Sequence, residues 1–277
     1  MSPAGLHKMA YKEWGDRHNP RVLVCVHGLT RLSDDFDHLA EVMSKTHRVI
    51  CPDIVGRGRS DWLRDSRFYG IPQYISDMLT LIARLDVDQV DWFGTSMGGL
   101  IAMGMASLSG NPIRKLLLND VGCILNPEAI VRICEYVGKS GRFDTFEDGV
   151  KYVRSVSTSF GEHTDEQWAK FTSDVLRKDA DGKWRLHYDT SLAIPFSSFT
   201  PESEERDAAL LLAAYDAITC PTLLVRGAHS DLLTRETALL MTQRGPKAKL
   251  VEVDGVGHAP TFMHTEQIRI AEEFFKD

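Results

Sequence analysis

Two kinds of hydrophobic pattern alternate along this chain. Short apolar runs, such as residues 21–26 and 113–118, are separated by longer segments in which apolar residues recur at helical spacing, such as residues 72–85. Buried strands that alternate with amphipathic helices are typical of a mainly parallel sheet flanked by helices. The pattern therefore predicts an α/β fold. The expected strands are residues 9–14, 21–26, 47–51, 89–93, 113–118, 221–226 and 248–253, and the expected helices are residues 34–44, 72–85, 97–107, 235–244 and 265–275.

The alternation stops in the middle of the chain. Residues 122–206 contain consecutive helical patterns near 127–137, 146–157 and 165–177, and a short extended or strand-like segment at 184–188. We expect a core made of residues 1–121 and 207–277, with residues 122–206 inserted as a mainly helical cap. The aromatic residues of this segment either line a substrate cavity or hold the cap on the sheet; they include Phe143, Phe160, Trp168, Phe171, Phe196 and Phe199.

Composition limits the classes of protein to consider. The chain has 277 residues, 43% of them hydrophobic and 26% charged, which suits a globular protein with a large core. A net charge of −7 argues against a nucleic-acid partner. No stretch reaches the roughly 18–20 continuous apolar residues of a membrane helix, and the first residues lack a signal-peptide pattern. We therefore expect a cytoplasmic protein with no membrane partner; the oligomeric state is left open.

The cysteines and histidines give no sign of a metal or cofactor. Five cysteines, an odd number without C-x-x-C spacing, indicate neither a disulfide framework nor a zinc site. The histidines are scattered, and no phosphate-binding loop is present. Gly56 and Gly58 begin a G-x-G pattern, but Asp61 stands where a dinucleotide-binding motif needs its third glycine. We expect no cofactor and no metal.

One pentapeptide carries a chemical prediction. Gly94-Thr95-Ser96-Met97-Gly98 lies between a predicted strand and a predicted helix. A G-x-S-x-G motif in that setting is a sharp turn that exposes a serine in a strained backbone conformation, and its glycines avoid collisions there. The simpler interpretation is a serine that caps a helix. The strand before it and the small-residue helix after it favour Ser96 as a nucleophile.

A serine needs a base. His258 follows the predicted strand 248–253, within Gly255-Val256-Gly257-His258-Ala259-Pro260, and open α/β sheets place active sites beyond the carboxyl ends of strands. His229 is the competing base. For the carboxylate that orients the histidine, Asp231 follows the strand 221–226. Asp120, at the end of the strand 113–118, is the alternative, and it could instead bond to the surrounding loop.

The negative charge that forms on a substrate carbonyl needs two amide donors. The backbone amide of Met97, directly after Ser96, is the first expected donor. The second is expected from His27-Gly28-Leu29-Thr30, which ends the apolar strand 21–26, with Leu29 as the best candidate. The side chain of His27 is interpreted as an anchor for this loop rather than as a catalytic group.

Taken together, these motifs resemble the α/β-hydrolase superfamily over nearly the whole chain. The resemblance rests on His27-Gly28, Asp53-Ile54-Val55-Gly56-Arg57-Gly58-Arg59-Ser60, the Gly94–Gly98 turn, Arg226-Gly227-Ala228-His229-Ser230-Asp231 and Gly257-His258. It implies the order nucleophile, acid, base, met here by Ser96, Asp231 and His258. Arg57 and Arg59 either bind a substrate anion or brace their loop.

The predicted function is that of a serine hydrolase that cleaves a small carboxylic ester, lactone or thioester through an acyl-enzyme. A serine at the turn excludes the alkyl-enzyme chemistry of relatives with aspartate there. An alternative within the superfamily is a carbon-carbon bond hydrolase of ring-cleavage products, favoured by a basic site in the cap; Arg132, Arg142, Arg154 and Arg177 are available. An alternative of another class is a non-catalytic receptor for small ligands on the same fold.

Overall fold

The computed structural model describes residues 1–198 and 201–276. Within them lies a seven-stranded sheet in the order β1-β3-β2-β4-β5-β9-β10, in which β1 pairs antiparallel with β3 and the other strands pair in parallel. The strands are β1 (Tyr11–Trp14), β2 (Val22–Val26), β3 (Arg48–Pro52), β4 (Val90–Thr95), β5 (Ile113–Asn119), β9 (Thr222–Gly227) and β10 (Lys249–Val253). The α/β prediction is confirmed, with every expected strand in place.

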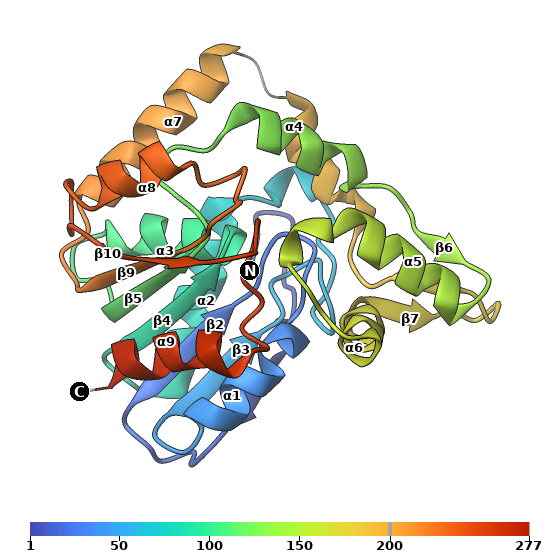
Figure 1. Ribbon diagram of the computed structural model, residues 1–277, viewed down its shortest axis with the longest axis horizontal. Helices are drawn as coiled ribbons and strands as arrows, with labels where there is room; N and C mark the ends of the chain where they lie inside the picture. The colour runs from blue at the N-terminus through green and yellow to red at the C-terminus, as the bar shows by residue number, and fades with distance from the viewer. Residues whose placement is uncertain (199–200, 277) are drawn as a thin grey trace.

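Helices cover both faces of this sheet (Figure 1). They are α1 (Asp37–Met43), α2 (Ile71–Leu85), α3 (Met97–Ala106), α8 (Arg235–Met241) and α9 (Thr265–Phe275), with short 3₁₀ turns at Ser33–Phe36 and Ser66–Phe68. In β2, Val22, Val24 and Val26 pack with α2 and α3, whereas Leu23 and Cys25 pack with α1 and α9. Successive side chains of a strand point to opposite faces, so an all-apolar strand is what a sheet buried on both faces requires.

The chain leaves the sheet between β5 and β9, and most of the elements there lie beside the carboxyl ends of the strands (Figure 1). The elements of this segment are α4 (Pro127–Tyr136), β6 (Arg142–Phe143), α5 (Phe146–Val156), η3 (Thr158–Phe160), α6 (Asp165–Val175), β7 (Leu176–Lys178), β8 (Trp184–Leu186), η4 (Thr190–Ser198) and α7 (Pro201–Asp216). The three expected helices and the extended segment near residue 184 are present. We call the elements from α4 to η4 the cap.

Two features of this region differ from the sequence prediction. β6, β8 and β7 form a small antiparallel sheet, which is too short to leave a period in the sequence. Helix α7 was not predicted, because its first half, Pro-Glu-Ser-Glu-Glu-Arg-Asp, carries no apolar stripe. Since α7 runs across residue 206, the boundary expected there remains a prediction.

The cysteines and the lengths of the helices bear on the expectations from composition. All five cysteines are free, and Cys25, Cys51 and Cys123 are buried among apolar neighbours. Nowhere in residues 1–198 and 201–276 is there a helix both long enough and apolar enough to span a membrane.

Candidate active site

Ser96 lies at a sharp turn between β4 and α3, as the pentapeptide predicts. Its backbone has φ 50° and ψ −114°, a left-handed conformation that costs energy for a residue with a side chain. Small neighbours make the turn possible, because a Cβ atom on Gly94 would lie 2.5 Å from the Gly98 backbone. The strain is thus held in place by the close contact between β4 and the start of α3.

His258 contacts Ser96 from the loop after β10. Its Nε2 lies 3.0 Å from Ser96 Oγ. The Ser159 hydroxyl, from the cap, donates to the His258 carbonyl and holds this loop against the cap. His229, the competing base, is exposed, and its backbone N–H donates to the Val256 carbonyl at 2.8 Å. The structure therefore brings His258, and not His229, to the serine.

Asp120 lies on the other side of the imidazole. Its Oδ2 is 2.8 Å from His258 Nδ1, and the whole residue is buried. The same carboxylate accepts hydrogen bonds from Gly227 N–H at 2.8 Å and from the Ser230 hydroxyl at 2.6 Å. A carboxylate only accepts, so Nδ1 carries the proton and Nε2 is free to accept the Ser96 proton.

The expectation that Asp231 orients the histidine is wrong. Asp231 instead forms a two-pronged ion pair with Arg132 of α4, at 2.7 Å and 2.9 Å, and its side chain is 43% exposed. Asp120, the alternative named from the sequence, occupies the position next to His258. The physical reason is that β5 and β9 are neighbouring parallel strands, so the residues after both emerge at the same edge of the sheet.

The loop after β2 approaches Ser96 from the opposite side. His27 is buried; its Nδ1 donates to the Gly28 carbonyl at 2.7 Å, and its Nε2 accepts from Ile54 N–H at 3.0 Å. Burial lowers the pKa of His27 to about 4, so the imidazole is neutral and anchors the loop. Leu29 then lies on the wall of a cavity beside Ser96.

The amides of Leu29 and Met97 are available for a ligand. In the described part of the chain, neither amide donates a hydrogen bond to another protein group. Met97 is the first residue of α3, where N–H groups have no partner within the helix and the helix dipole favours negative charge. The two residues named from the sequence thus present free donors near one serine.

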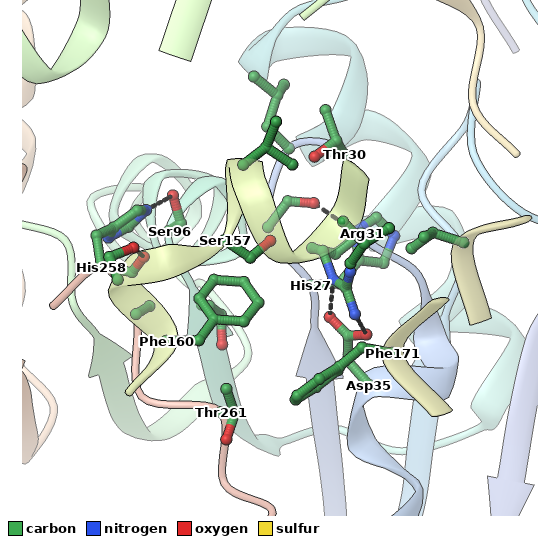
Figure 2. Close-up of a pocket in the computed structure, with 18 of the residues that line it drawn as sticks. His27, Thr30, Arg31, Asp35, Ser96, Ser157, Phe160, Phe171, His258 and Thr261 are labelled. Carbon is green, nitrogen blue, oxygen red and sulfur yellow. Dashed lines mark hydrogen bonds and ion pairs between the residues drawn. The ribbon is translucent and has the colours of Figure 1, made fainter. Parts of the chain in front are cut away.

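A cavity of about 110 Å³ opens beside Ser96 and His258, between the sheet and the cap (Figure 2). Phe160 and Phe171 of the cap line it, as expected for some of the cap aromatics. The others hold the cap together or pack on the core. Phe143 packs against Tyr152, Trp168 packs with Leu32, Val153 and Val175, and Phe196 packs against the main core. Phe199 lies outside the described residues.

The far end of the cavity holds an ion pair that the sequence analysis did not identify. Arg31 donates to Asp35 through Nε at 2.8 Å and Nη2 at 2.5 Å, and its guanidinium lies over the rings of Phe160 and Phe171 (Figure 2). Burial alone would lower the pKa of Arg31, but Asp35 and more distant Asp174 raise it. Its only sequence signal is that it follows Leu29 by two residues.

The cap arginines do not form a free basic site. Arg132 lines the cavity, but Asp231 pairs with it. Arg142 pairs with Asp181, Arg154 with Asp165, and Arg177 donates to His187. Among the described residues that line the cavity, both arginines, Arg31 and Arg132, already have a carboxylate partner.

Comparisons with known proteins show the family of this chain. The model of the "Alpha/beta hydrolase family" matches residues 23–271. A 3-hydroxybutyrate-oligomer hydrolase of Cupriavidus necator is 56% identical over 99% of this chain and 95% of its own length. An esterase of Escherichia coli is 29% identical over 91% of this chain and 90% of its own. The crystal structure of an alpha/beta hydrolase from Novosphingobium aromaticivorans has a TM-score of 0.84 and 32% identity, covering 97% of this chain and 94% of its own.

Proposed function

The chain belongs to the alpha/beta hydrolase family, and we propose that it is an ester hydrolase that forms an acyl-enzyme on Ser96. One observation carries the proposal: His258 lies between the Ser96 hydroxyl, at 3.0 Å, and the Asp120 carboxylate, at 2.8 Å. Serine hydroxyls react at neutral pH when a base takes their proton and a third group orients that base.

In the first half-reaction, Ser96 Oγ attacks the ester carbonyl while its proton passes to His258 Nε2. The new C–O bond and the negative oxygen form a tetrahedral intermediate, held by the amides of Leu29 and Met97. Collapse breaks the bond to the leaving alcohol, which takes the proton from Nε2. Asp120 stabilises the imidazolium that exists in between.

In the second half-reaction, His258 takes a proton from water, and the resulting hydroxide attacks the acyl carbon. The same amides hold the second tetrahedral oxyanion. The bond to Ser96 Oγ then breaks, Oγ regains the proton from Nε2, and the carboxylic acid leaves. No group other than these residues and water is required for the proton balance.

We propose short oligomers of 3-hydroxybutyrate as the substrate class, because the relative from Cupriavidus necator is named for hydrolysis of such oligomers. These esters carry methyl groups, ester carbonyl oxygens, one terminal hydroxyl and one terminal carboxylate. The cavity offers both kinds of contact: Phe160 and Phe171 are apolar, and the Arg31–Asp35 pair donates and accepts hydrogen bonds.

The Arg31–Asp35 pair suits a neutral polar group of the substrate better than the carboxylate of the substrate. Asp35 already balances the charge of Arg31, and Asp174 lies close enough to raise the pKa of Arg31. An incoming carboxylate would meet these acids in a poorly hydrated site, whereas a hydroxyl can donate to Asp35 and accept from Arg31. We therefore assign the pair to a hydroxyl or ester carbonyl of the substrate.

The test is hydrolysis of the dimer and trimer of 3-hydroxybutyrate by the purified protein, with the products identified by mass spectrometry. Wild type should release monomer, and Ser96→Ala should release none while keeping the same circular dichroism spectrum. A fluorophosphonate should add to wild type and not to Ser96→Ala in intact-mass spectra. Equal labelling of both proteins would contradict the role of Ser96. Stabilisation by the dimer without turnover would instead support a receptor, and turnover of ring-cleavage dienoates alone would support carbon-carbon bond hydrolysis.

A further inference from the structure

Arg57 is a fully buried arginine that the reaction described above does not use. It belongs to the loop after β3 and has no exposed surface. Its neighbour in the sequence motif, Arg59, has a different environment, since Arg59 pairs with Asp34 at 2.9 Å and with Asp53 at 3.3 Å. The two arginines of this loop therefore have separate roles.

The guanidinium of Arg57 contacts both residues whose amides we assign to the oxyanion. Its Nε donates to the Leu29 carbonyl at 2.9 Å, and its Nη2 donates to Met97 Sδ at 3.2 Å. A bond to the Leu29 carbonyl restrains the backbone of that residue, and with it the direction of its amide. A contact to the Met97 side chain restrains the first residue of α3. One side chain thus braces both halves of the proposed oxyanion site from behind.

The remaining contacts hold Arg57 in a rigid position. Its Nη1 donates to the Val55 carbonyl at 2.7 Å and to the Tyr74 hydroxyl at 3.0 Å. The guanidinium also lies over the rings of Tyr74, at 5.0 Å, and Tyr69, at 6.0 Å. Four of the five N–H donors of an arginine are thereby satisfied by hydrogen bonds. A side chain held this firmly keeps the geometry of its partners fixed.

The positive charge of Arg57 is not cancelled by a direct ion pair. Among residues 1–198 and 201–276, no carboxylate lies within 4.0 Å of its guanidinium nitrogens. Asp53, an acid of the same loop, instead accepts from Ser33 N–H and Arg59 N–H, each at 2.9 Å, and pairs with Arg59. Asp189 of the cap accepts from the Tyr69 hydroxyl at 2.7 Å. Buried charges usually have a direct ion-pair partner, and a charge without one acts over a longer range in a poorly hydrated interior.

The loop of Arg57 is also joined to the cap. Gly58 N–H donates to the His187 carbonyl at 2.9 Å, and Asp189 N–H donates to the Gly56 carbonyl at 2.8 Å. Tyr188, between these two cap residues, lines the cavity. The backbone around Arg57 therefore connects the substrate-facing part of the cap to the residues behind the oxyanion site.

We propose that Arg57 is a positioning residue for ester hydrolysis: it fixes the amides of Leu29 and Met97 and places a positive charge without a direct ion-pair partner behind the oxyanion. The inference rests on the proposed function, since it presupposes an oxyanion at these amides. Interactions that strengthen only when the oxyanion forms raise kcat and leave substrate binding almost unchanged. Loss of Arg57 should therefore appear in kcat and in the binding of transition-state analogues.

The experiment compares wild type, Arg57→Lys and Arg57→Met with p-nitrophenyl butyrate as substrate. An alkyl trifluoromethyl ketone is the probe, because its hemiketal with Ser96 places an oxyanion at the two amides. Arg57→Met should lose about 10–100-fold in kcat, with KM changed by less than about threefold, and should lose a similar factor in affinity for the ketone. Arg57→Lys keeps a cation but lacks the planar guanidinium that reaches two partners. Its kcat and its affinity for the ketone should therefore lie between those of wild type and Arg57→Met.

Arg48→Met is the matched control. Arg48 is a buried arginine of β3 that bonds to Glu13 and to the Leu85 carbonyl, remote from the contacts described above. Its removal should lower the melting temperature and leave kcat and ketone affinity unchanged. If Arg57→Met also behaves this way, Arg57 is only structural and the proposal is wrong. If Arg57→Met does not fold, Arg57→Lys and Met97→Leu decide, because wild-type kcat and ketone affinity in both would overturn the proposal.

The wild-type protein separates this inference from the proposed function. If wild type neither turns over the ester nor binds the ketone, the proposed function fails first. If wild type does both and the Arg57 variants match it, the hydrolase assignment stands and only the role of Arg57 is withdrawn.

Discussion

The Asp120 carboxylate lies 2.8 Å from Nδ1 of His258, although 138 positions separate the two residues along the chain. Asp120 directly follows β5, and His258 follows β10, so neither is a sequence neighbour of Ser96. The contact is completed by Gly227 N–H and the Ser230 hydroxyl, which bond to the same carboxylate. Mutation can therefore test whether Asp120 is the acid that orients His258.

Replacement of the two candidate acids should have very different effects. Asp120→Asn turns an acceptor next to His258 Nδ1 into a group that can donate, which favours the wrong tautomer, and we expect kcat to fall roughly 10³–10⁴-fold. Asp231→Asn is the control, because Asp231 is half-exposed and bonded to Arg132. Its kcat should stay within about threefold of wild type. Steady-state kinetics on p-nitrophenyl butyrate, with folding checked by circular dichroism, measures both, and a larger loss from Asp231→Asn would return the acid to β9.

The two candidate bases can be compared in the same way. His258→Gln removes the group that accepts the Ser96 proton, so kcat should fall by roughly 10⁴-fold or more. His229→Gln changes an exposed side chain and should leave kcat within about twofold of wild type. Fluorophosphonate labelling rates give an independent readout, since they report serine activation without product release. Rapid labelling of His258→Gln would contradict the assignment.

The ion pair at the end of the cavity should determine which esters are preferred. The double variant Arg31→Gln/Asp35→Asn removes both charges together, so no unpaired charge is left buried. We expect KM for the 3-hydroxybutyrate dimer to rise about tenfold, because hydrogen bonds to its oxygens are lost, whereas KM for p-nitrophenyl butyrate should change less than about twofold.

A second ion pair, of which Arg132 lines the same cavity, provides the control. Arg132 and Asp231 are partly exposed, so the variant Arg132→Gln/Asp231→Asn should change both KM values by less than about threefold. Equal increases in KM for both substrates in Arg31→Gln/Asp35→Asn would show that the pair holds the cavity in shape and does not recognise the substrate.

Stability should fall on mild acidification, in part because of His27. Burial holds the pKa of His27 at about 4 in the folded protein, against 6.5 for the free side chain. The unfolded chain therefore binds more protons between these values, so the free energy of unfolding falls as the pH drops from 6.5 towards 4. A shift of this size corresponds to roughly 3 kcal/mol.

Urea unfolding of wild type and His27→Gln between pH 4 and pH 7 measures this contribution. Glutamine can still accept from Ile54 N–H but does not titrate, so the variant should lose less stability on acidification. His163 and His187 have similarly lowered pKa values from burial, but they are only half-buried and should contribute less. Equal pH dependence in both proteins would show that His27 does not titrate in this range.

Local patterns in the chain were sufficient for much of the fold and part of the candidate site. Strand β2 is a continuous apolar run because both faces of the sheet are buried, and such a run is legible without coordinates. The turn at Ser96 needs small residues at Gly94 and Gly98, so it leaves a mark in five consecutive positions. The bracing of the loop by His27 was likewise expected from its place after β2.

Other features depend on contacts between distant segments. In the sequence, Arg31 and Asp35 resemble charged residues of a surface loop. They line a cavity only because the cap lies over them. Arg57 gave no sign of its contacts with Leu29 and Met97, because those residues lie 28 and 40 positions away. Helix α7 was missed because its first half has no apolar stripe.

The sequence by itself determined that a serine stands at a strand-to-helix turn, that a histidine follows the last strand, and that an aspartate follows one of two strands between them. It did not determine which aspartate, because β5 and β9 are adjacent and parallel and deliver Asp120 and Asp231 to the same edge of the sheet. Tertiary structure decided it. Gly227 N–H and the Ser230 hydroxyl hold the buried Asp120 carboxylate towards His258, while Arg132 from the cap pairs with Asp231.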